Sequence, residues 1–275
     1  MKHNVIVRAL SGIVYVGLIV GCILAGKIWF CLLLTVLSIG AVIEYLNLAG
    51  KTAGGRLPKF HYILTVITAF FIWLFSLILT EDEITIFYSI PIFIIYLPLL
   101  FCSGVFLKSP LALTGVKNSL FSFFYIVFPL CFLYFIYSIY GIESILFIFI
   151  GIWINDTGAF CVGCSIGRHR LCERLSPKKS WEGFWGGLFF TVVAALIYAI
   201  ITHRDIPFMC IYGAAISVLA TIGDLFESLL KRKAGVKDSG NLIPGHGGVL
   251  DRIDSLLFVS WVAFFLGAAI FVRAI

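Results

Sequence analysis

The amino-acid sequence predicts an all-α polytopic bundle of about nine transmembrane helices, with the N-terminus on the cytoplasmic side. Composition is the first reason, because 61% of the 275 residues are hydrophobic and only 12% are charged. The mean hydropathy is +1.08, and a soluble domain of this length cannot bury so much apolar surface. The second reason is the length of the apolar segments, and the third is the distribution of the basic residues.

Each apolar segment is judged by its length. A helix rises about 1.5 Å per residue, so crossing the hydrocarbon layer takes about 20 apolar residues. The segments that qualify are 5–25, 28–49, 61–80, 84–107, 119–140, 144–162, 182–202, 206–229 and 256–273. The apolar pattern continues along the chain, so the first segment is expected to be a retained span rather than a signal peptide. Strands are not expected, because no segment alternates with period two. Pro91, Pro98 and Pro129 predict kinks.

The basic residues predict the orientation of these spans. An odd number of spans places the two termini on opposite sides of the membrane. With a cytoplasmic N-terminus, all of the 20 Lys and Arg residues lie on the cytoplasmic side except Lys27, Arg204 and Arg273. Positive residues accumulate in cytoplasmic loops of membrane proteins, so this asymmetry supports an N-in, C-out arrangement. The net charge of +6 is explained in this way, and no nucleic-acid partner is expected.

The chain is expected to have two parts. Residues 1–140 form an N-terminal part of about five spans, and residues 141–275 form a C-terminal part with the polar chemistry. Two cytoplasmic loops, 163–181 and 230–255, combine charged residues with Gly and Pro. No polar stretch is long enough to fold as a soluble domain by itself. At least four of the eight Cys residues fall in apolar runs, so no disulfide framework is expected.

The densest group of polar residues lies between positions 223 and 254. Asp224, Glu227 and Ser228 are three and four residues apart, which places them on one face of a helix. A basic run, a Gly-rich turn and a pair of acids follow. These are Lys231, Arg232, Lys233 and Lys237, then residues 244–248 with His246, Gly247 and Gly248, then Asp251, Arg252 and Asp254.

This combination of residue types predicts a phosphoryl- or nucleotidyl-transfer site. Carboxylates near a membrane surface are costly unless they bind a cation or a basic group. Their oxygen atoms suit Mg²⁺, which usually takes one or two carboxylates together with substrate phosphates. Glycines allow backbone N–H groups to approach a phosphate closely, and Lys and Arg supply the opposite charge. The alternative is a basic loop that orients the chain or contacts head groups, but it does not explain acids, His and glycines in one loop.

A second group of polar residues lies between positions 153 and 183. Asn155 and Asp156 interrupt an apolar span, which suggests a functional site. The alternative is an Asp that caps a broken helix or pairs with a Lys. Ser180 could be the N-cap of the next helix, whose N–H groups would then face an anion beside Lys178 and Lys179. The alternative is that Ser180 only caps the helix and that the two lysines only orient the chain in the membrane.

The polar positions from Ser228 to Asp254 resemble the signature of the phosphatidate cytidylyltransferase (CDP-diacylglycerol synthase) family. The stretches NDTGAF (155–160) and SPKKSWEG (176–183) resemble that family as well. The resemblance is specific over residues 151–255, whereas the first 140 residues match only as generic spans. It implies an enzyme that transfers the cytidylyl group of CTP to phosphatidate, giving CDP-diacylglycerol and pyrophosphate for phospholipid biosynthesis. It further implies that the protein lies in the cell (inner) membrane and that its active site faces the cytoplasm. The implied cofactor is Mg²⁺, and a second, monovalent cation could also bind. Whether the protein forms a homodimer stays an open question.

The resemblance also assigns roles to residues. Asp224 and Asp251 would be the metal ligands, with Asp254 and Asp156 as further contributors. The catalytic set is Asp224, Asp251, Lys231, Lys237, His246 and Arg252, in which the basic residues contact phosphates. The substrate-binding set is Asn155, Asp156, Ser176, Lys178, Lys179, Ser228, Arg232, Gly247 and Gly248.

The sequence departs from the family pattern in the first loop. Ser180 stands where the family often has Thr. Cys161 and Cys164 stand where it more often has an aromatic and a basic residue, which removes one phosphate contact that Arg168 could replace. Cys161, Cys164, His169 and Cys172 also have a spacing similar to a zinc knuckle, although Cys161 is expected at a membrane helix end.

Two other functions fit part of the pattern. A CTP-dependent lipid-alcohol kinase could use a similar pocket, and its products would be a lipid monophosphate and CDP. A transporter or channel would suit an acid within a span, but it predicts acids in spans of both halves. Glu44 is the single acid within the first five expected spans, which disfavours a transport pathway.

Overall fold

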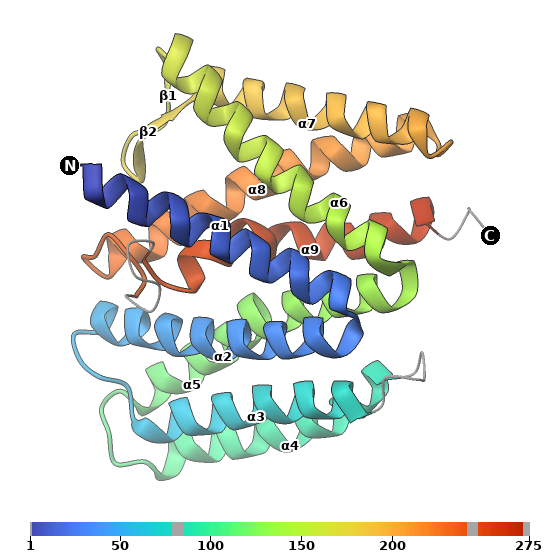
Figure 1. The fold of residues 1–275 in the computed structure, drawn as a ribbon. Helices are drawn as coiled ribbons and strands as arrows, with labels where there is room; N and C mark the ends of the chain where they lie inside the picture. The colour runs from blue at the N-terminus through green and yellow to red at the C-terminus, as the bar shows by residue number, and fades with distance from the viewer. Residues whose placement is uncertain (1, 79–84, 241–246, 272–275) are drawn as a thin grey trace. The chain divides into compact units, whose positions relative to one another are not determined.

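The computed structural model describes residues 2–78, 85–240 and 247–271, with side chains over 12–78, 91–240 and 247–267. These residues form an all-α fold with one small hairpin (Figure 1). Its helices and strands are α1 (Lys2–Ala25), α2 (Lys27–Thr52), α3 (Lys59–Ile78), α4 (Thr85–Phe106), α5 (Ala112–Ser122), the π-helix η1 (Phe123–Val127), α6 (Phe128–Ile166), β1 (Arg170–Cys172), β2 (Ser176–Ser180), α7 (Trp181–Ile201), α8 (Ile206–Lys233) and α9 (Leu250–Phe271).

Five segments of the described chain are long and apolar enough to cross a membrane. They are Lys27–Thr52, Lys59–Ile78, Ala112–Ile166, Trp181–Ile201 and Ile206–Lys233. The longest of them contains a break at Gly141, which has φ 80° and ψ −175°, in the gap between the expected spans 119–140 and 144–162. The number of nine spans and the N-in orientation stay predictions.

The expected spans are almost entirely helical where the structure describes them, but the first polar loop contains a pair of short strands that the sequence did not predict. Strands β1 and β2 pair in an antiparallel hairpin within the first polar loop, with Arg170 opposite Ser180 and Cys172 opposite Ser176. The strands have three and five residues, which is too short for a period-two pattern to stand out in the sequence.

Contacts divide the chain into two compact units. One comprises Met1–Tyr134 with Lys233–Arg252, and the other comprises Phe135–Arg232 with Ile253–Ile275. In the first unit α2 packs against α1, α3 and α5, and α3 packs against α4 (Figure 1). Large apolar side chains of α2, such as Leu34, Val42 and Leu46, are fully buried there.

A local change of helix type occurs before Pro129. The segment η1 is a π-helix, and α6 begins directly after it. Pro129 lacks an N–H, so the carbonyl four residues earlier loses its usual donor, and a π-helical turn is a common adjustment. Pro91 and Pro98 lie inside α4, where the kinks that they are expected to cause stay predictions.

In the second unit, α7 packs against its neighbours through a stripe of small residues. Gly183, Gly186, Gly187, Thr191, Ala195 and Ala199 are buried, whereas large apolar residues such as Trp185, Phe189 and Ile197 are exposed. A Cβ on Gly183 would lie 2.8 Å from the carbonyl oxygen of Ala159, and one on Gly187 would lie 2.6 Å from Asn155 Oδ1. Helices α6 and α7 therefore approach at backbone distance, which is typical of membrane helices with small residues at their interface.

Candidate active site

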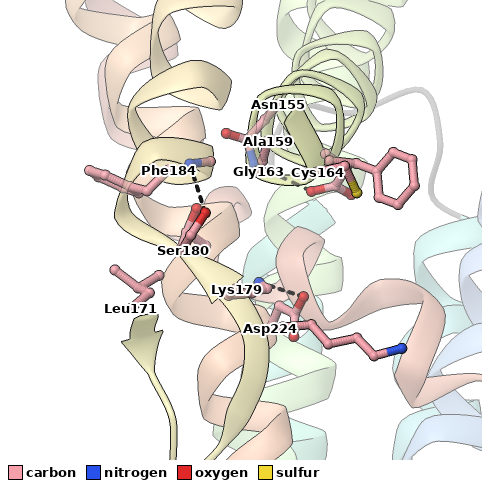
Figure 2. A pocket seen from close by; sticks show the side chains of 14 residues that line it. Asn155, Ala159, Gly163, Cys164, Leu171, Lys179, Ser180, Phe184 and Asp224 are labelled. Carbon is pink, nitrogen blue, oxygen red and sulfur yellow. Dashed lines mark hydrogen bonds and ion pairs between the residues drawn. The ribbon is translucent and has the colours of Figure 1, made fainter. Parts of the chain in front are cut away.

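A pocket of about 300 Å³ lies within the second unit (Figure 2). Helix α6, the hairpin, α7 and α8 all contribute to its wall. Its lining is Asn155, Asp156, Ala159, Phe160, Gly163, Cys164, Leu171, Lys178, Lys179, Ser180, Gly183, Phe184, Thr221 and Asp224. Five of the residues predicted for substrate or metal binding are therefore brought together from segments that are up to 69 positions apart in the sequence (Asn155 to Asp224).

An ion pair in the pocket joins Lys179 and Asp224. Lys179 Nζ of β2 lies 2.6 Å from Asp224 Oδ2 of α8, and Figure 2 shows the two side chains pointing toward one another. Both side chains keep about a third of their surface exposed, at 29% and 37%. The ion pair thus faces the cavity, where a phosphorylated ligand could reach it.

Asn155 is placed to orient its neighbour Asp156. Its side chain is only 2% exposed. Ser217 Oγ donates a hydrogen bond of 2.6 Å to Asn155 Oδ1, so the amide nitrogen is directed the other way and donates to Asp156 Oδ1 at 3.3 Å. Helix α6 continues through Asp156 to Ile166, so the alternative of a capped, broken helix is wrong.

Asp254 stands close to Asp224 at the start of α9. The two helices touch here, because a Cβ on Gly223 would lie 2.6 Å from the Asp254 carbonyl oxygen. Burial, together with the negative charge of Asp224, raises the pKa of Asp254 well above the usual range of an aspartate. Two acids that repel each other in this way fit a divalent cation, which would relieve the repulsion.

Two of the remaining predicted residues of α8, Ser228 and Lys231, form contacts within the helix. Ser228 Oγ donates to Asp224 Oδ1 at 3.4 Å. Lys231 forms an ion pair with Glu227, whose side chain is buried at 1% exposure. Arg232 is exposed. Ser176 begins β2, and the lining of the pocket as given above includes neither it nor Ser228.

The hairpin is anchored by Glu182, a residue that the sequence analysis did not single out. Its carboxylate accepts hydrogen bonds from the backbone N–H groups of Arg168 and His169, at 3.1 and 3.2 Å. His169 Nδ1 lies 2.6 Å from the same carboxylate. Ser180 is the N-cap of α7 and accepts from Gly183 N at 3.1 Å, which confirms the predicted cap.

No zinc site forms in the first loop. Among the described residues, no group of three or more His, Cys, Asp and Glu side chains is arranged to hold a metal ion. His169 is engaged by Glu182 instead, so the zinc-knuckle alternative for Cys161, Cys164, His169 and Cys172 is wrong.

Asp251 belongs to the first unit and is held by its own loop. Its Oδ2 accepts hydrogen bonds from Ser239 N at 2.9 Å, Ser239 Oγ at 2.9 Å and Gly248 N at 2.8 Å. Gly247 has φ +84°, and a Cβ there would lie 2.8 Å from Asp251 Oδ2, so this turn requires glycine.

The other predicted residues of this loop are described in part. Lys237 is exposed, and the Arg252 carbonyl accepts from the Tyr15 hydroxyl at 3.0 Å. His246 lies outside the described residues. Its predicted phosphate contact, like the predicted roles of the residues above, stays a prediction.

An apolar helical bundle whose pocket combines acids and lysines is the arrangement expected of a membrane protein that acts on a phosphorylated substrate. The chain belongs to the Cytidylyltransferase family, whose sequence profile matches residues 6–270. The match extends over the N-terminal helices, which were expected to match only as generic spans.

Three relatives show the extent of the similarity. The chain is 33% identical over 277 residues to the phosphatidate cytidylyltransferase of Bacillus subtilis, covering 97% of each protein. It is 43% identical over 136 residues to the enzyme of that name from Haemophilus influenzae, covering 46% of this chain and 47% of the relative. For Staphylococcus saprophyticus the identity is 44% over 121 residues, covering 43% and 46%.

Proposed function

We propose that this chain transfers the cytidylyl group of CTP to phosphatidate, forming CDP-diacylglycerol and pyrophosphate. The observation that carries the proposal is the ion pair between Lys179 and Asp224 at the wall of the pocket. Joining two phosphorylated substrates requires positive charge at the reacting phosphates, and this pocket combines lysines with carboxylates that could hold a cation. The printed name of the relative from Bacillus subtilis, which aligns with nearly the whole chain, supports phosphatidate as the acceptor.

The reaction needs little proton transfer. A phosphate oxygen of phosphatidate attacks the α-phosphorus of CTP, the bond from that phosphorus to the bridging oxygen of the β-phosphate breaks, and pyrophosphate leaves with the electron pair. The attacking oxygen is already anionic, so no strong general base is required. The obstacle is repulsion between two polyanions, which positive groups in the pocket reduce.

Residues of the pocket, with two further acids of α9, are proposed to divide this work. Lys178 and Lys179 bind phosphate oxygens, and Asn155 keeps Asp156 oriented toward the cavity. Asp224 and Asp254 would hold Mg²⁺, and Asp251 is proposed as a further ligand on the strength of the family signature. When bound, Mg²⁺ supplies charge neutralisation at the phosphates.

The location of the reaction follows from the substrates. CTP is available in the cytoplasm and phosphatidate is in the bilayer, so a pocket at the inner surface of the cell membrane gives access to both. Most Lys and Arg residues fall on one side of the expected spans, and the usual excess of positive residues in cytoplasmic loops supports this orientation.

One assay in detergent tests the proposal. Purified protein receives phosphatidate, labelled CTP and Mg²⁺, and the products are separated. We expect labelled CDP-diacylglycerol. In a parallel reaction a lipid alcohol replaces phosphatidate. Labelled CDP from that reaction, with no labelled CDP-diacylglycerol from the first, would show the kinase alternative and would overturn the proposal.

Asp224→Asn tests the acid at the centre of the site. We expect its kcat to fall at least about 100-fold, because loss of a charge-stabilising group at the reacting phosphates costs roughly 3 kcal/mol or more. Glu173→Gln is the control, since Glu173 is an exposed acid between β1 and β2 that does not line the pocket. Near-wild-type turnover in folded Asp224→Asn would remove Asp224 from the site.

A further inference from the structure

Glu44 is a buried acid of α2 whose two carboxylate oxygens are fully engaged by a distant segment. Its side chain is 4% exposed. Val249 N donates to Oε1 at 3.0 Å, and Leu250 N donates to Oε2 at 2.9 Å. Ser239 Oγ lies 3.0 Å from Oε2. A carboxylate inside an apolar helix is costly unless it has such partners, so the contacts are specific.

Two glycines make room for this carboxylate. A Cβ on Gly240 would lie 2.2 Å from Glu44 Oε1, and a Cβ on Gly248 would lie 2.4 Å from Oε2. Any side chain at either position would displace the carboxylate. Residues 239–240 and 248–250 therefore surround the Glu44 carboxylate. They donate hydrogen bonds to it, and their two glycines leave the space that it occupies.

The same contacts lead to Asp251. Ser239 Oγ lies 3.0 Å from Glu44 Oε2 and 2.9 Å from Asp251 Oδ2, so its single proton serves one carboxylate at a time. Gly248 N donates to Asp251 Oδ2, while the next two backbone N–H groups donate to Glu44. Glu44 thus holds the first turn of α9, from which the Asp251 side chain projects.

We propose that Glu44 is a positioning residue for the cytidylyl transfer, acting through Ser239 and the first turn of α9 on Asp251. The inference rests on the proposed function for its catalytic consequence. Its structural basis, the closure of residues 239–240 and 248–250 around one buried carboxylate, is independent of the reaction.

Glu44→Gln is the variant that separates positioning from folding. The Gln side chain has the same size as that of Glu44, but its NH₂ group replaces one acceptor oxygen. One of the two backbone N–H groups, of Val249 or Leu250, would therefore face a donor and lose its hydrogen bond. We expect the Mg²⁺ concentration for half-maximal activity to rise at least about tenfold, as is usual when a residue that orients a metal ligand is changed. A purely structural role would lower Tm and the active fraction and leave the Mg²⁺ dependence unchanged. Ser38→Ala, at a buried site of the same helix, is the control and should match wild type.

A second variant pair tests the shape of the closure. Gly240→Ala should resemble Glu44→Gln, because its methyl group would collide with Oε1. In a Glu44→Ala background that collision is gone, so Gly240→Ala should add little further loss. Additive losses from the two changes would contradict the proposed contact.

Amide hydrogen exchange tests the closure without substrate. We expect Val249 and Leu250 to exchange faster in Glu44→Gln than in wild type. Unchanged exchange and unchanged Mg²⁺ dependence in a folded, active variant would overturn the inference alone. An inactive wild-type protein in which exchange still responds would instead overturn the proposed function, and with it the catalytic role of Glu44.

Discussion

At the scale of single residues, Lys179 and Asp224 show how a charged pocket is stable without its ligand. Each side chain is about two-thirds covered, so leaving either charge without a partner would be costly. The ion pair satisfies both, and the remaining exposed surface lies at the cavity. Asn155 has a complementary task, because its fixed amide keeps Asp156 in one orientation.

Lys179→Met is expected to weaken nucleotide use while the helices stay folded. A hydrogen bond to a charged group contributes about 1.5–3 kcal/mol, so kcat/KM for CTP should fall roughly 10- to 100-fold. Initial rates over a range of CTP concentrations measure this. Lys51→Met, at an exposed position in the last turn of α2, should leave kcat/KM unchanged. An equal loss in both variants would show that total charge, and not this ion pair, matters.

At the scale of helices, the glycines of α7 determine how closely α6 can approach. Gly187 lies against both the side chain and the carbonyl oxygen of Asn155, at 2.6 and 2.9 Å from an added Cβ. The same contact sets the position of Asp156 in the pocket. Close packing and the geometry of the site therefore depend on one small residue.

Gly187→Ala is expected to destabilise the protein, because overpacking at a close contact costs typically about 1–3 kcal/mol. Thermal unfolding in detergent should show a lower Tm, and kcat should fall as Asn155 is displaced. Gly21→Ala in α1 is the matched control, since nothing lies within 4 Å of a Cβ at that helical position. A Tm for Gly187→Ala equal to that of the control would contradict the packing described for α6 and α7.

At the scale of the whole molecule, orientation is the property on which access to CTP depends. An odd number of spans with a cytoplasmic N-terminus predicts an external C-terminus. Alkaline phosphatase fused to the C-terminus should be active, and a fluorescent protein fused there should be dark. The same fluorescent protein at the N-terminus should fluoresce. Fluorescence from both fusions would contradict the odd span count.

The glycine-rich signature and the apolar segments could be recognised without coordinates. Apolar residues in runs of about 20 have few stable arrangements other than membrane helices, so most expected spans lie within a few residues of described helices. The hairpin β1–β2 was missed because strands of three and five residues carry too little pattern. Substrate binding by Asn155 stays a prediction, and its burial and two hydrogen bonds, which the sequence did not predict, indicate that it also orients Asp156.

The sequence alone determined the helical class, the family resemblance and the residue types of a phosphate-transfer site, because these depend on composition and on spacing along the chain. Tertiary structure decided which of those residues share a pocket, that Glu182 anchors the hairpin, and that Glu44 holds the start of α9. Glu44 meets Ser239 and Leu250 across 195 and 206 positions. Spacing carries no information about partners so far apart, since only the packing of the helices brings them within hydrogen-bonding distance.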